Sequence, residues 1–182
     1  DSESSGKKSI EIFEQLLRDN PDSDAIRYEL ATTLASTEAF NFGQIMRFQR
    51  AEQLSKSLLA KSPALPRYQA LHALALESLA AQQLRTNRLR LVEENLKESL
   101  ALYNQLSSSA SEVSRYDTRR SAVLELLADL KLRQGDRDAA IDYLEQAIHG
   151  VQPKRRRGAV STVAQVQLAR LKQKLGRIED HP

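Results

Sequence analysis

The segment 130–148, LKLRQGDRDAAIDYLEQAI, carries a glycine and an aspartate in the middle of an otherwise helical pattern. Apolar residues recur at helical spacing both before and after this break. Glycine is favoured just beyond a helix because it adopts a positive φ at little cost, and aspartate can cap the start of the next helix. We therefore expect Gly135 to end one helix and Asp136 or Asp138 to begin another, so that the two helices form an antiparallel hairpin.

The same pattern extends along the chain of 182 residues, which contains eight amphipathic stretches separated mostly by short polar turns. Apolar residues make up 41% of the sequence and aromatic residues 5%, and the residues with the highest helix propensity dominate. No stretch of Val, Ile and Thr alternates as a strand would. The sequence therefore predicts an all-α protein in which neighbouring hairpins stack, because one hairpin alone cannot bury its apolar face.

Breakers and caps define the expected boundaries. Asn20-Pro21 is expected to end the first helix, and Ser23 or Asp24 can cap the second. Later turns are expected at 41–43 and 86–87, and Ser111 can cap the sixth helix. The helical domain is expected over residues 9–176, between a polar linker at 1–8 and a polar tail at 177–182.

The stretch LELLADLKLRQGDRDAAIDYLEQAIHGVQP resembles a tetratricopeptide repeat, a helix-turn-helix module of about 34 residues. Its large and small apolar positions match those of the repeat, and a proline follows near the expected terminal place. These positions are Leu124, Leu127, Ala128, Ala140, Leu144, Ala147 and Pro153. Weaker matches extend over most of residues 9–176. The resemblance implies a right-handed α-solenoid of about three and a half hairpins, with the first helix of each hairpin lining a concave groove.

Six residues fall on that groove face when the family's positions are transferred to this sequence. They form pairs four residues apart, and each pair therefore shares one helix face. The pairs are Tyr28 and Thr32, Gln69 and Ala73, and Glu125 and Asp129. Members of the family that clamp a terminal carboxylate use Lys, Asn and Arg in the groove. Because Glu125 and Asp129 have the opposite charge, the sequence favours a basic or polar peptide.

The strongest local charge is the basic run Lys154, Arg155, Arg156 and Arg157. It is interpreted first as a solvated loop, and otherwise as a docking site for an acidic protein, a lipid head group or a nucleic acid. No aromatic residues interleave with these cations, so nucleic-acid binding is the less favoured interpretation. A net charge of +3 permits an acidic partner without requiring one.

The sequence contains none of the patterns that mark common catalytic or cofactor sites. There is no cysteine, no glycine-rich phosphate loop and no nucleophile elbow. The three histidines have no partner at the spacing of a metal site or a catalytic triad, and His72 is expected to have a structural role within a helix. We therefore expect a protein without enzymatic activity, metal or cofactor.

The resulting prediction is a protein-interaction scaffold that binds a peptide or a partner domain through its concave groove. The alternatives are a structural or oligomerisation domain of a larger regulatory or membrane-anchored protein, and nucleic-acid binding through the basic run. We expect a monomer or a weak homodimer with no membrane insertion of its own, since no apolar stretch is long enough to cross a bilayer. The chain begins with Asp1, so we expect a soluble part of a larger protein, and the sequence leaves open whether its compartment is cytoplasmic or extracytoplasmic.

Overall fold

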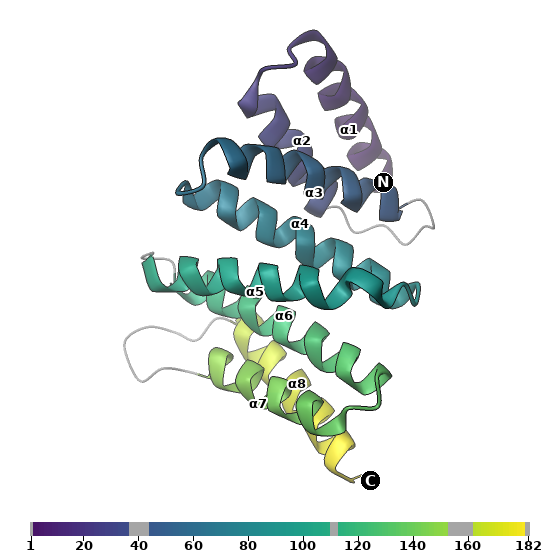
Figure 1. Cartoon of the computed structure of the whole chain (residues 1–182), viewed down its shortest axis with the longest axis vertical. Coiled ribbons are helices and arrows are strands. Elements are labelled where there is room, and N and C mark those ends of the chain that lie inside the picture. The colour runs from purple at the N-terminus through teal and green to yellow at the C-terminus, as the bar shows by residue number, and fades with distance from the viewer. Residues whose placement is uncertain (1, 37–43, 110–112, 153–161, 181–182) are drawn as a thin grey trace. The chain divides into compact units, whose positions relative to one another are not determined.

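The computed structural model describes residues 2–36, 44–109, 113–152 and 162–180, and nearly all of these residues are helical (Figure 1). The fold is all-α, as predicted, and the described residues include eight α-helices and one short 3-10 helix. Their bounds are α1 (Ser2–Asp19), α2 (Asp24–Ser36), α3 (Gln44–Lys61), α4 (Pro66–Arg85), η1 (Leu89–Leu91), α5 (Val92–Ser109), α6 (Val113–Arg133), α7 (Arg137–Val151) and α8 (Thr162–Asp180).

The chain divides into two compact units, which we call unit 1 (residues 1–102) and unit 2 (residues 103–182). The expected single domain at 9–176 thus corresponds to two separate clusters of contacts. The helix α1 begins at Ser2 and α8 continues to Asp180, so both helices extend into the segments that were expected as a polar linker and a polar tail.

Unit 1 is built from consecutive helices between which the chain reverses direction (Figure 1). The helix α2 packs against α1 and α3, α3 packs against α4, and α2 also packs against α4. The core of this unit consists of leucines and small residues that are buried between the helices, including Leu30, Ala31, Ala51 and Leu58. Alanines at these positions allow close approach of the helix backbones, and the leucines fill the space between turns.

Unit 2 contains the α6–α7 hairpin, and α8 packs against α7. Six of the seven residues that carry the repeat pattern are fully buried here, with zero exposure at Leu124, Leu127, Ala128, Ala140, Leu144 and Ala147, and the seventh, Pro153, lies outside the described residues. The apolar spacing of the sequence therefore identified the contact face of this hairpin correctly.

Local chemistry accounts for the helix boundaries. In the α6–α7 turn Gly135 has a φ of +79°, and the Asp136 carboxylate accepts a hydrogen bond from the Ala139 amide at 3.1 Å. Of the two caps expected there, the structure selects Asp136. Ser23 Oγ accepts from the Ile26 amide at 3.4 Å at the start of α2. The turn expected at 41–43 and the cap expected at Ser111 lie outside the described residues.

We predict that Gly135→Ala lowers the free energy of unfolding by about 1 kcal/mol, because a Cβ atom disfavours the left-handed conformation. An added Cβ would meet no atom within 4 Å, so the cost comes from the backbone alone. Gly176→Ala is the matched control: its Cβ also meets nothing, but it lies inside α8, where alanine is favoured. Urea unfolding followed by circular dichroism measures both changes, and equal effects at the two sites would contradict the prediction.

Candidate functional site

The surface with the most features of a binding site lies in unit 1, where α2 and α4 pack together. The Tyr28 ring of α2 lies 6.0 Å from the Tyr68 ring of α4, measured between centroids. The Arg67 guanidinium carbon lies 5.7 Å from the Tyr28 centroid and 5.0 Å from the Tyr68 centroid. We call these three residues the Arg67–tyrosine cluster. Tyr68 is buried, Tyr28 is half-buried and Arg67 is exposed, so the guanidinium lies at the outer edge of two rings that are tilted by 40° to each other.

The other predicted groove residues of unit 1 differ in their burial and in their hydrogen bonds. Thr32 Oγ1 donates to the Tyr28 carbonyl at 2.8 Å, and Gln69 Nε2 donates to the Pro63 carbonyl at 2.9 Å. Both side chains are half-buried, and their hydrogen bonds go to backbone carbonyls within a few residues of their own positions. Ala73 is fully buried, and its carbonyl accepts a hydrogen bond from Ser99 Oγ of α5 at 2.8 Å. Ala73 therefore does not line a groove, because α5 covers it.

In unit 2 the two predicted groove carboxylates bind cations of the chain's own α8. Glu125 pairs with Arg170, and also with Lys174 at 3.3 Å. Lys174 Nζ lies 2.6 Å from Asp129. The last helix neutralises the acidic face, so these carboxylates do not form a free acidic surface for a basic peptide. This pairing could not be predicted from local spacing, since Arg170 and Lys174 lie 45 and 49 residues beyond Glu125 along the chain.

The basic run 154–157 lies outside the described residues. Among the remaining residues no three His, Asp or Glu side chains come together as metal ligands. Within the same described ranges, no helix has both the length and the apolar character that crossing a membrane requires.

A second cluster of polar side chains lies around the buried His72 of α4. The Nδ1 atom lies 3.0 Å from Ser55 Oγ of α3, and Nε2 lies 3.4 Å from Glu98 Oε1 of α5. The hydroxyl proton of Ser55 lies within reach of both His72 and the Glu52 carbonyl, which is 2.9 Å from Oγ. Serine, histidine and glutamate also form catalytic triads, but here Ser55 is 0% and His72 1% exposed, so a substrate cannot reach the hydroxyl. This arrangement is a hydrogen-bonded bridge between three helices.

Burial lowers the pKa of His72, because the charged imidazolium loses its hydration. The carboxylates of Glu98 and Glu52 oppose this shift, and Lys56 adds to it. The imidazole is therefore neutral in the folded protein at neutral pH.

The lowered pKa of His72 predicts that the protein is less stable in mild acid. In the unfolded chain His72 titrates near its ordinary pKa of 6.5, whereas the folded chain binds the proton only at lower pH. The contribution of the neutral His72 to the free energy of unfolding is fully present above pH 6.5 and is lost as the pH falls below that value. The His72→Gln variant lacks the titrating imidazole at this position, so its unfolding free energy should change less between pH 7 and pH 5 than that of the unchanged protein. Identical pH profiles of the two proteins in urea unfolding would refute the assignment. Asp24 does not interfere, because its own pKa is lowered from 3.8 by Lys61.

Comparisons with known proteins returned no match for this chain, whether with family models, curated proteins or solved structures.

Proposed function

We propose that this chain is a non-catalytic protein-interaction module of stacked, tetratricopeptide-like helical hairpins, and that it binds a peptide segment on the α2–α4 face of unit 1. The Arg67–tyrosine cluster carries the proposal. Tyrosine and arginine are enriched among the residues that contribute most binding energy in protein interfaces, and here they are held together at the surface.

The packing of unit 1 supports the hairpin part of the proposal. The helix α2 contacts both its chain neighbour α3 and the next-but-one helix α4. Stacked hairpins produce this pattern, because the first helix of one hairpin lies beside the first helix of the next. Tyr28 and Gln69, which the repeat pattern places on the groove, lie on these two helices.

A peptide selection tests the proposed binding. Random dodecapeptides displayed on phage are selected against the full chain, and the winning peptides are mapped by amide chemical shifts of the labelled protein. We expect the shifts to centre on Tyr28, Thr32 and Gln69, and Tyr28→Ala to weaken binding about tenfold, or about 1.4 kcal/mol. Tyr143→Ala, at a half-buried tyrosine of α7 in unit 2, is the control and should leave binding unchanged. A selection without binders, or shifts confined to unit 2, would refute the proposal.

One observation favours assembly as a second function. The helix α8 buries Ala164 and Leu171 but leaves Val163 66% and Val166 65% exposed. Large aliphatic side chains on the outer face of a helix are candidates for contact with another chain. Light scattering of the full chain and of the V163S/V166S variant tests this function: a mass that rises with concentration only in the unchanged protein supports it, and equal monomer masses exclude it.

A further inference from the structure

The Arg67 guanidinium is held in place but its donors are largely unused. A guanidinium has five N–H donors in one plane. Its one hydrogen bond within the described part of the chain is a long contact of 3.5 Å from Nη2 to the Tyr68 hydroxyl, and no carboxylate there pairs with it. The cation–π contacts with the two rings restrict the side chain, so part of its entropy is already lost before an anion binds.

The neighbouring cations are already paired. In the first turn of α2, Arg27 Nη1 lies 2.5 Å from Asp24 Oδ1. In the last turn of α3, Lys61 Nζ lies 2.7 Å from the same Asp24 oxygen. Arg67 lies in the first turn of α4, which has proline at its start and no side-chain cap. The positive end of the helix dipole therefore adds to the charge of Arg67, and the first turn of α4 contains no acidic residue.

From this arrangement we propose that the Arg67–tyrosine cluster binds a side-chain carboxylate, an aspartate or glutamate flanked by an apolar residue in a partner peptide. The carboxylate accepts two N–H bonds from the guanidinium, because the two planar groups match in geometry. The apolar neighbour covers the exposed part of the Tyr28 ring.

The charge of the site favours a carboxylate over a phosphate group. One unpaired guanidinium matches a single negative charge, whereas a phosphate monoester carries nearly two at neutral pH. This inference rests on the proposed function and reverses the preference for basic peptides that the sequence suggested. The reversal follows from Glu125 and Asp129, whose charges α8 already neutralises.

Two blocked peptides test the inference directly. Both are acetylated and amidated octapeptides in which leucine alternates with a polar residue, glutamate in one and glutamine in the other. Blocking the ends removes the terminal carboxylate, so only side-chain carboxylates remain. Each is titrated into the labelled full chain while the arginine side-chain signals are followed. We expect the Arg67 signal to shift with the glutamate peptide, at least fivefold weaker binding of the glutamine peptide, and loss of the preference in Arg67→Gln.

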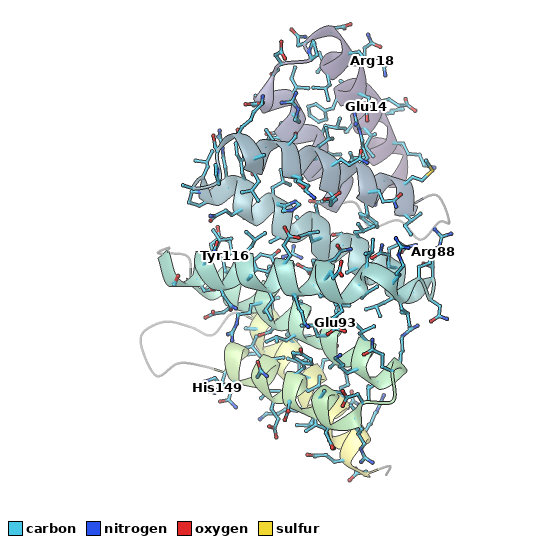
Figure 2. All side chains as sticks on the ribbon, in the orientation of Figure 1. Glu14, Arg18, Arg88, Glu93, Tyr116 and His149 are labelled. Carbon is cyan, nitrogen blue, oxygen red and sulfur yellow. The ribbon has the colours of Figure 1, made fainter. Side chains whose placement is uncertain are left out.

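The control is Arg18→Gln, at an exposed arginine of α1 that is labelled in Figure 2 and hydrogen-bonded to Gln15 at 2.7 Å. This variant should retain the preference for glutamate. Arg67→Lys keeps the charge but loses the planar fork, and should weaken binding of the glutamate peptide severalfold. Equal binding of the two peptides, or an unchanged preference in Arg67→Gln, would overturn the inference.

Other outcomes separate this inference from the proposed function. If the phage selection yields neutral peptides that bind the α2–α4 face, the proposed function stands and the carboxylate inference fails. If the selection yields no peptide, the proposed function fails. A single-stranded oligonucleotide that shifts the Arg67 signal at lower concentration than the glutamate peptide would overturn the inference in favour of nucleic acid.

Discussion

Replacing Leu127 by alanine is expected to lower the free energy of unfolding by about 2–5 kcal/mol. Leu127 lies on the contact face of α6 and is fully buried, between residues that the repeat pattern assigns to the hairpin interface. The truncation removes apolar area from the core and leaves a cavity, which close-packed neighbours fill only in part. Urea unfolding of the full chain, followed by circular dichroism, measures the loss.

The matched control is Val166→Ala in the same unit. Val166 is 65% exposed, so its truncation should change the free energy by less than about 0.5 kcal/mol. A similar loss in the two variants would show that the buried and exposed faces of unit 2 have been assigned incorrectly. If only the Leu127 variant loses stability, the apolar spacing of the sequence has identified the face that holds the hairpin together.

Local features of the fold could be predicted because their causes lie within a few residues. The Gly135–Asp136 turn, the cap at Ser23 and Pro66 in the first turn of α4 depend only on backbone conformation and neighbouring amides. The same holds for the buried face of α6 and α7, since helical spacing fixes which side chains share a face. The sequence could not predict that the contacts divide near residue 102, within α5, because such a division depends on distant pairs.

The candidate site was less accessible to sequence reasoning. Tyr28 was predicted as a groove residue and is part of the cluster, but Arg67 was not predicted, because it lies in the first turn of α4 and outside the positions that the resemblance assigned to the groove. The sequence feature that could have indicated this site is an arginine beside a tyrosine after a Ser-Pro turn. That pattern alone is weak evidence of a binding site. Ala73 was assigned to a surface that α5 covers, which spacing along one helix cannot reveal.

The contacts of His72 with α3 and α5 likewise could not be predicted from spacing along one helix. Substitution of this residue is expected to cause the second large loss of stability. We expect His72→Ala to cost about 3 kcal/mol at pH 7, because the change leaves a cavity and removes one of the two partners of the buried Ser55 hydroxyl. Ser55→Ala should cost less, about 1–2 kcal/mol, since it removes one hydrogen bond and little volume. Urea unfolding of the full chain at pH 7 measures both changes.

The control for this series is His149→Ala, at an exposed histidine in the last turn of α7. It should change stability by less than about 0.5 kcal/mol, which separates loss of a buried ring from loss of any imidazole. Combining His72→Ala with Ser55→Ala should cost less than the sum of the single changes, because each removes the partner of the other. Strict additivity would mean that the 3.0 Å contact between His72 and Ser55 contributes no coupling free energy, and His72 would then stabilise unit 1 through its packing and its contact with Glu98.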